Sequence, residues 1–192
     1  MANRTSARAR RQLASALAIA ALSVGLVSVG GAANAATPDQ AGTQARSCSY
    51  DLGTGSLVCV DAGEDLNEAV LEQAHLQVVA PGGAGGAGAR AAFAPAGVQA
   101  TYIQSQLYDD ANYGGSFFQI THSSACNGST TWNFGPLGNV GWSGRVSSFK
   151  SFSGCSTKLW QGTSYSGASY GYAVNAASLG SMNDQANSVT MR

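Results

Sequence analysis

Residues 107–115 read LYDDANYGG, and residues 159–167 read LWQGTSYSG. Both stretches place an aromatic residue after a leucine, then four polar or small residues, a tyrosine, one further residue and a glycine. A second matching pair follows them, at residues 143–149 and 183–189. Two matches in the same order in both halves indicate a duplicated supersecondary unit. The duplication therefore limits the fold to one built from two related units.

Short apolar and aromatic runs recur between clusters of Gly, Asn and Ser throughout residues 101–192. They lie at Thr101–Tyr108, Phe117–Ile120, Ser147–Phe152, Lys158–Trp160, Ala168–Val174 and Ser188–Arg192. Regularly spaced short strands with turn signals between them are typical of an all-β sandwich or barrel. A stretch of about ninety residues buries only a thin core, so a stabilising disulfide is expected.

The chain has four cysteines, Cys48, Cys59, Cys126 and Cys155, which allow three connectivities. Proximity in the sequence favours Cys48–Cys59 and Cys126–Cys155. The residues inside the first pair are turn-rich, which predicts a hairpin closed by a disulfide. Because no C-x-x-C pair or histidine cluster accompanies the cysteines, a zinc site is not expected.

The first 35 residues have the pattern of an export signal. Arginines precede an uncharged apolar run at Leu13–Val29, and Ala33–Ala35 forms a small-x-small cleavage site before Ala36. A membrane anchor is the alternative, but the small residues of the run and the cleavage site favour secretion, with no membrane contact afterwards. The pair Arg10 and Arg11 leaves open whether export uses the general or the twin-arginine route. Export also places the cysteines where disulfides form.

Removal of the signal leaves six basic residues against ten acidic ones, a net charge of −4. Residues 36–100 carry two basic and seven acidic residues, a net charge of −5. Residues 101–192 carry four basic and three acidic residues, a net charge of +1. Neither part has the strongly basic surface that binding to nucleic-acid phosphates requires, so nucleic acid is not an expected partner.

The exported part divides into three segments. Residues 36–80 are predicted to hold the disulfide-closed hairpin and a helix at Glu64–His75, where apolar residues recur at helical spacing. Residues 81–100 form a Gly/Ala-rich linker, which is expected to act as a flexible tether to the β domain at 101–192. The sequence leaves open whether 36–80 is retained as an accessory part or removed as a propeptide.

The repeated stretches resemble the aromatic-glycine corner of the βγ-crystallin Greek key. The matching residues are Tyr108, Tyr113 and Gly115 in the first repeat and Trp160, Tyr165 and Gly167 in the second. In that family the aromatic ring folds over a hairpin, and the glycine adopts a backbone conformation closed to other residues. The resemblance implies an all-β fold, with two Greek-key motifs forming a βγ-crystallin-like sandwich. Secreted bacterial members include metalloproteinase inhibitors and killer-toxin-like proteins of actinobacteria.

The downstream pieces, SGRVSS at residues 143–148 and NDQANS at residues 183–188, resemble the calcium motif of this family. The resemblance implies sites between the two loops, and its expected ligands are Ser147, Asp184, Asn187 and the backbone carbonyls of Arg145 and Gln185. Gly144 supplies no side-chain ligand, so one weak calcium site is expected. In the alternative interpretation both loops are structural turns, in which Ser148 and Ser188 bond backbone groups.

The β domain offers few groups for catalysis. It contains one histidine, His122, and three carboxylates. Asp109 and Asp110 are neighbours in a turn, and the serines lie in no nucleophile motif. Because no acid, base and nucleophile converge in the sequence, the chain is predicted not to be an enzyme.

Binding to another macromolecule is therefore the expected role. The first repeat carries an insertion at residues 127–142 with Trp132, Phe134 and Trp142, which are either partner contacts or core residues. We expect a secreted, weakly calcium-binding module that stabilises an extracellular protein and contacts a partner. The alternatives are an inhibitor of an extracellular metalloproteinase acting through residues 127–142, and a killer-toxin-like protein.

Overall fold

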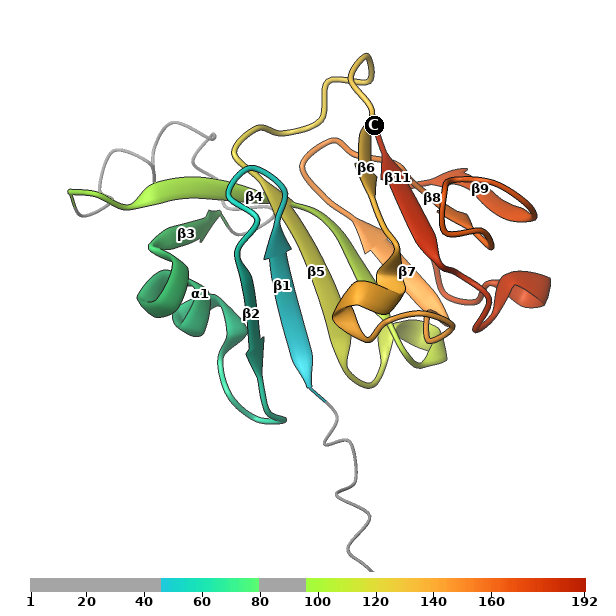
Figure 1. Ribbon diagram of the computed structural model, residues 1–192, viewed down its shortest axis with the longest axis horizontal. Helices are drawn as coiled ribbons and strands as arrows, with labels where there is room; N and C mark the ends of the chain where they lie inside the picture. The colour runs from blue at the N-terminus through green and yellow to red at the C-terminus, as the bar shows by residue number, and fades with distance from the viewer. Residues whose placement is uncertain (1–45, 80–95) are drawn as a thin grey trace, which may run out of the picture. The chain divides into compact units, whose positions relative to one another are not determined.

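The computed structural model describes residues 46–79 and 96–192. The expected signal peptide, residues 36–45 and most of the Gly/Ala linker lie outside these ranges. The described part is built mainly of β-strands, with one α-helix (Figure 1). None of its helices has the length and apolar character needed to cross a membrane.

Two sheets carry the duplicated part of the chain. The first repeat forms β4 (Gln99–Tyr108), β5 (Phe117–His122), β6 (Trp132–Phe134) and β7 (Ser148–Ser151). The second forms β8 (Thr157–Trp160), β9 (Ser169–Ala173), β10 (Asn175–Ala176) and β11 (Ser188–Met191). Single turns of 3₁₀ helix lie at Ala111–Tyr113, Leu137–Val140 and Gly180–Met182.

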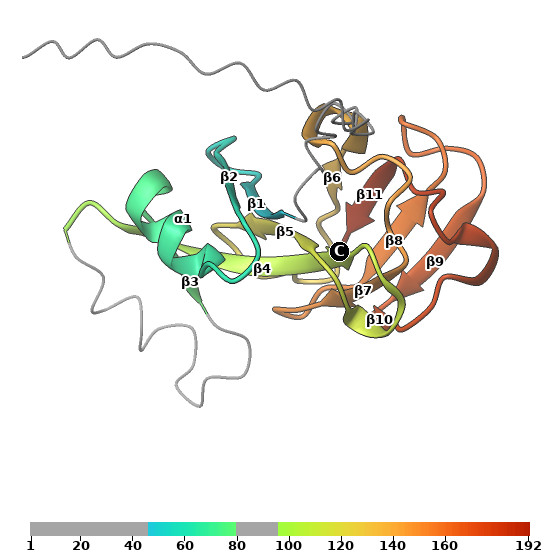
Figure 2. The same ribbon diagram turned by 90° about the horizontal axis from the view of Figure 1, so that it is seen from below.

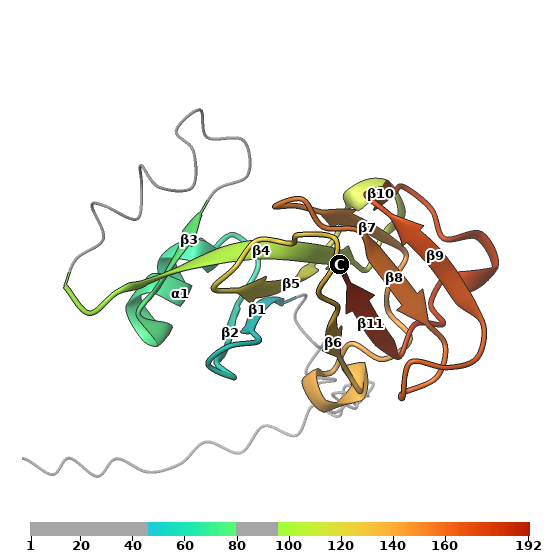
Figure 3. The same ribbon diagram turned by 90° about the horizontal axis from the view of Figure 1, so that it is seen from above.

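The strand order is that of two interlocked Greek keys. One sheet, called sheet A, contains the run β10-β7-β4-β5, and the other, sheet B, has the order β6-β11-β8-β9 (Figures 2 and 3). Each repeat thus gives its third strand, β6 or β10, to the sheet of the other repeat. Because of this exchange the two repeats share one core, and the all-β, double Greek-key fold expected from the sequence is confirmed.

Strand β6 is one of the elements that the sequence did not predict. It is three residues long and pairs with β11, with Phe134 opposite Val189. Three residues are too few to show a strand alternation, so only the pairing with β11 defines this strand.

The N-terminal segment contains the predicted hairpin and helix. Its elements are β1 (Ser47–Asp51), β2 (Leu57–Val60), α1 (Leu66–Ala74) and β3 (Leu76–Val79). Cys48 lies opposite Cys59 in the hairpin, and the two are joined by a disulfide. Asp65 caps the helix, since its Oδ1 accepts hydrogen bonds from the backbone N–H groups of Asn67 (2.8 Å) and Glu68 (3.1 Å).

This segment belongs to sheet A rather than forming a separate hairpin. Strand β1 pairs in parallel with β5, with Cys48 opposite Phe118, and β3 pairs in parallel with the first half of β4. The apolar face of α1 then packs with residues of β2 and β3, in a second cluster around Val58, Leu66 and Val70. The sequence did not reveal this pairing, because strands that meet from distant parts of the chain leave no local pattern.

A buried carboxylate ties the segment to the first Greek key. Asp51 is 3% exposed, and its Oδ2 accepts hydrogen bonds from Thr101 Oγ1 (2.6 Å) in β4 and Thr121 Oγ1 (2.9 Å) in β5. Its Oδ1 accepts from the backbone N–H groups of Gly53 (3.0 Å) and Thr54 (2.9 Å). Burial acts to raise the pKa of Asp51, but these hydrogen bonds outweigh it and hold that pKa below its ordinary value.

The main core lies between the two sheets. Its fully buried side chains come from both repeats and include Leu107, Phe118, Phe149, Leu159 and Val189. Cys126 and Cys155 form the second expected disulfide, which joins the start of the insertion to the link between the repeats. Both cysteine pairings favoured by the sequence are therefore present.

Candidate functional site

The first corner is closed by a serine from the end of its own repeat. Ser148 Oγ donates a hydrogen bond to the carbonyl of Asp110 (2.6 Å) and accepts one from the backbone N–H of Tyr113 (3.0 Å). The ring of Tyr113 packs edge-on against Tyr108, with ring centroids 5.8 Å apart. The aromatic residues thus fold over the turn, as the resemblance implied.

The second corner repeats the same bonds. Ser188 Oγ donates to the carbonyl of Gly162 (2.6 Å) and accepts from the backbone N–H of Tyr165 (3.1 Å). This is the bonding that the structural-turn interpretation predicts for Ser148 and Ser188, and it accounts for the last serine of each loop.

The two candidate calcium loops are joined by two backbone hydrogen bonds. The backbone N–H of Asp184 donates to the carbonyl of Val146 (3.0 Å), and the backbone N–H of Gly144 donates to the carbonyl of Ala186 (3.0 Å). Gly144 and Asp184 occupy equivalent positions and both have left-handed backbone, with φ of 64° and 55°. Each loop therefore contributes the same pair of groups to the other, as pseudo-twofold symmetry requires.

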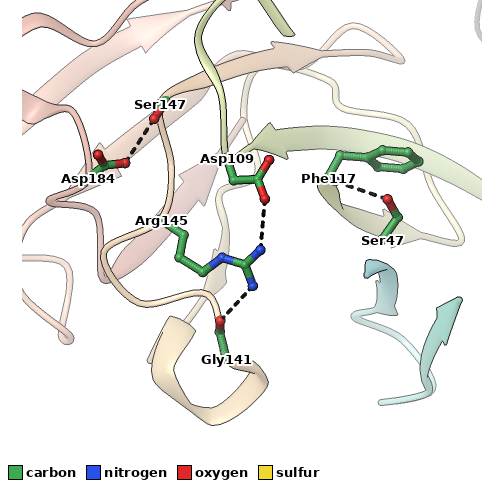
Figure 4. A network of polar contacts seen from close by, with 7 residues as sticks. All are labelled: Ser47, Asp109, Phe117, Gly141, Arg145, Ser147 and Asp184. Carbon is green, nitrogen blue, oxygen red and sulfur yellow. Dashed lines mark hydrogen bonds and ion pairs between the residues drawn. The ribbon is translucent and has the colours of Figure 1, made fainter. Parts of the chain in front are cut away.

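Ser147 and Asp184 come together between the loops (Figure 4). Ser147 Oγ donates a hydrogen bond to Asp184 Oδ1 (2.9 Å), and Asp184 Oδ2 accepts one from Asn183 Nδ2 (2.7 Å). A hydroxyl and a carboxylate from two loops, with the carbonyl of Arg145 beside Val146 in the chain, are the hard oxygen donors that calcium prefers. The chemistry of these residues fits a calcium ion of low affinity, because only one of them is charged.

The side chain of Arg145 points away from this pair (Figure 4). Its Nη2 forms an ion pair with Asp109 Oδ2 (2.9 Å), its Nη1 donates to the carbonyl of Gly141 (3.2 Å), and its Cζ lies 4.4 Å from the ring centroid of Trp142. The guanidinium charge is therefore balanced by Asp109 rather than directed at Asp184.

At the equivalent position, Asn187 is held by hydrogen bonds within the protein. Asn187 Nδ2 donates to the carbonyls of Gln161 (2.7 Å) and Gln185 (3.1 Å), and its Oδ1 contacts Ser143 Oγ. The Gln185 carbonyl, an expected ligand, is thus already bonded to an amide. Gly144 adds no side chain on the facing loop. The side-chain amide of Asn187 thus donates hydrogen bonds to two backbone carbonyls, one of which was an expected calcium ligand.

Replacing Asn187 with alanine is expected to lower the free energy of unfolding by about 1–2 kcal/mol, since two hydrogen bonds to carbonyls are lost. Chemical denaturation followed by fluorescence measures the change. The loss is expected to be the same in EDTA and in millimolar calcium, because the amide and not a metal holds this loop. A loss that calcium reverses would contradict this account.

The three aromatic residues of the insertion have different environments. Trp142 is 1% exposed and Phe134 is 9% exposed, and both belong to the main core. Trp132 is partly exposed and packs against His122, with ring centroids 5.3 Å apart. Trp142 and Phe134 are therefore core residues, and of the three only Trp132 is accessible to a partner.

No protein-family model and no curated protein matches the sequence. Several solved structures are similar to part of it. A mutant of a βγ-crystallin domain from Clostridium beijerinckii is 21% identical, with 46% of this chain and 95% of that chain covered at a TM-score of 0.38. A βγ-crystallin domain from Flavobacterium johnsoniae is 23% identical (46% and 92% covered, TM-score 0.36).

A third similar structure is the βγ-crystallin from Ciona intestinalis, which is 22% identical, with 45% of this chain and 95% of that chain covered at a TM-score of 0.35. These likenesses concern less than half of the chain. The strand order and register described above define its fold.

Proposed function

We propose that the chain is an exported, non-enzymatic binding module with one weak calcium site between residues 143–148 and 183–188. The observation that supports the site most directly is the contact of Ser147 Oγ with Asp184 Oδ1 across the two joined loops. Calcium bound there would be held by these two side chains and the carbonyl of Arg145. The bound ion would add a further link between the two repeats, at the loops that the backbone hydrogen bonds already join.

The disulfides support the extracellular role. Two are present in the described part of the chain, Cys48–Cys59 and Cys126–Cys155. Exported proteins commonly use disulfides to stabilise small cores. Calcium sites in extracellular modules have dissociation constants of about 10⁻⁴–10⁻³ M, which suits a site with one carboxylate.

Calcium titration by calorimetry tests this function. The native protein is expected to bind one ion with a dissociation constant of about 1 mM. At ten times that concentration, calcium raises the free energy of unfolding by about 1.4 kcal/mol. Asp184→Gly should abolish both effects without backbone strain, because glycine accepts the left-handed conformation that Asp184 adopts.

Asp110→Asn is the matched control for the loss of one negative charge from a corner loop, and it should leave the titration unchanged. The proposal fails if the native protein gives no binding heat and no calcium-dependent change in stability. It also fails if Asp110→Asn weakens binding as much as Asp184→Gly does, since the effect would then reflect net charge.

One observation favours peptidase inhibition as the second candidate. Residues 127–131 are exposed and directly follow the Cys126–Cys155 bridge, and Asn127 Oδ1 accepts hydrogen bonds from the backbone N–H groups of Ser129 (3.0 Å) and Thr130 (2.9 Å). An exposed segment held in this way loses little conformational entropy on docking. Inhibition of an extracellular metalloproteinase of the thermolysin type at excess protein would test this candidate. The killer-toxin-like alternative stays a prediction.

A further inference from the structure

The outer face of sheet B carries a row of alternating rings and cations. In β8, Leu159 is fully buried toward the core, whereas its neighbours Lys158 and Trp160 are partly exposed on the opposite face. Lys158 Nζ lies 3.7 Å from the ring centroid of Trp160 and 6.0 Å from that of Tyr172 in β9. Arg192 Cζ lies 3.9 Å from the same Tyr172 centroid. We call these four residues the aromatic-cation row.

A single buried hydroxyl is hydrogen-bonded to both aromatic residues of the row. Thr190 in β11 lies opposite Lys158 and is 5% exposed. Its Oγ1 accepts a hydrogen bond from Trp160 Nε1 (3.2 Å) and shares another with the hydroxyl of Tyr172 (3.2 Å). Both rings are thus fixed by side-chain bonds as well as by packing, and the cations stacked on them lose little further freedom when a ligand binds.

The backbone at the end of the row is also held. The N–H of Arg192 donates to the carbonyl of Ser156 (3.0 Å), and the N–H of Ser156 donates to the carbonyl of Arg192 (2.8 Å). Strand pairing therefore continues to Arg192, and its guanidinium belongs to the ordered face rather than to a loose end.

The positive charges of the row are not neutralised by carboxylates. The ion pairs in the described part of the chain are Arg46–Asp61 and Arg145–Asp109, and neither involves Lys158 or Arg192. No acidic residue occurs in β6, β8, β9 or β11. Aromatic faces attract a cation through their quadrupole but leave its full charge in place. The side chains of these four strands and of Arg192 therefore include two cations and no carboxylate.

We propose that the aromatic-cation row binds an acidic polysaccharide, with its carboxylates bonded to Lys158 and Arg192. Charge-assisted hydrogen bonds from an ammonium and a guanidinium suit carboxylates, and the rings hold both cations in place on this face of the sheet. Two cations are too few for the many phosphate contacts on which nucleic-acid binding depends. The row lies on the face of sheet B opposite the core and needs no metal.

Affinity electrophoresis through gels containing polygalacturonate tests the proposal. EDTA is included so that the result does not depend on calcium, and neutral dextran serves as the polymer control. The native protein is expected to be retarded by polygalacturonate alone. The double variant Lys158→Gln, Arg192→Gln should bind at least about 10-fold more weakly than the native protein, because both charge-assisted contacts are lost.

Lys150→Gln is the matched control, since Lys150 in β7 is also stacked on a ring, 4.3 Å from the centroid of Tyr113, but lies in sheet A. It should bind like the native protein. Tyr172→Leu keeps both cations and removes the ring between them, so binding should fall about 3-fold through lost preorganisation. Circular dichroism and unfolding midpoints are used to check that each variant is folded. If the double variant is not folded, the single variant Arg192→Gln replaces it.

Three results would overturn the proposal. In the first, polygalacturonate does not retard the native protein. In the second, Lys150→Gln weakens binding to polygalacturonate as much as the double variant does. In the third, single-stranded DNA retards the native protein as strongly as polygalacturonate, and the same variants weaken that binding. The first result would exclude acidic polysaccharides as the ligand. The second would show that binding depends only on the net charge of the protein. The third would identify the row as a nucleic-acid-binding surface.

Discussion

Replacing Asp51 with asparagine is expected to lower the free energy of unfolding by about 3 kcal/mol at neutral pH. The carboxylate is buried and accepts hydrogen bonds from two threonine hydroxyls on β4 and β5 and from two backbone N–H groups of its own turn. Asparagine has one acceptor oxygen in place of two. It therefore leaves either the hydroxyls of Thr101 and Thr121 or the turn without its acceptor.

The effect of this substitution should depend on pH in a defined direction. The pKa of Asp51 is lower in the folded protein than its ordinary value of 3.8. A carboxyl group of this kind stabilises the fold fully above the unfolded pKa, and the contribution is lost as the pH falls through the folded pKa. The difference between the native protein and Asp51→Asn should therefore be constant from neutral pH to about 5 and shrink below about 4.

Urea denaturation at a series of pH values measures both effects. Asp61→Asn is the control, because Asp61 lies in the same segment but forms only an exposed ion pair with Arg46. Such pairs contribute little, so this variant should stay close to the native stability. Equal losses for the two variants, or a loss at Asp51 that persists unchanged in acid, would show that the buried carboxylate does not anchor the segment.

Asp51 also shows where the sequence was informative and where it was not. The turn signals around it predicted the hairpin, and the cysteine spacing predicted its disulfide, because both depend on residues close in the chain. Its hydroxyl partners, Thr101 and Thr121, lie 50 and 70 residues away. The parallel pairing that brings them together depends on the folded sheet, so no local pattern identifies it.

The candidate site divides in the same way. The repeated motif predicted that residues 143–148 and 183–188 lie together, and the backbone bonds between them agree with this. The amide of Asn187 is different, because its partners are the backbone carbonyls of Gln161 and Gln185. The position of a carbonyl follows from the chain path rather than from residue identity, so the sequence left Asn187 as a candidate ligand.

Substitution of Gly115 by alanine is the second change expected to have a large effect, with a loss of about 3 kcal/mol in the free energy of unfolding. Gly115 has φ of +73°, which by itself costs a residue with a side chain about 1 kcal/mol. A Cβ atom there would also lie 2.1 Å from Asp109 Oδ1 and 2.7 Å from Asp110 Oδ2. Both carboxylates would have to move.

Asp109 is not free to move without cost. Its Oδ2 is paired with Arg145, and its Oδ1 is buried against Gly115 without a hydrogen-bond partner. Displacing the carboxylate breaks the ion pair that also positions Arg145 over Trp142 in the core. The strain at one backbone position is therefore transmitted to the insertion through a single side chain.

Gly167, the equivalent glycine of the second corner, separates the two causes. Its φ is +80°, but the nearest atom to an added Cβ is 3.7 Å away. Gly167→Ala should therefore cost only the backbone term, about 1 kcal/mol. Adding Asp109→Ala to Gly115→Ala should cost less than the sum of the single losses, because the closer of the two clashes, the one with Asp109, is removed. Equal losses at both glycines and strict additivity would mean that backbone conformation alone, and not the contact with Asp109, makes Gly115 obligatory.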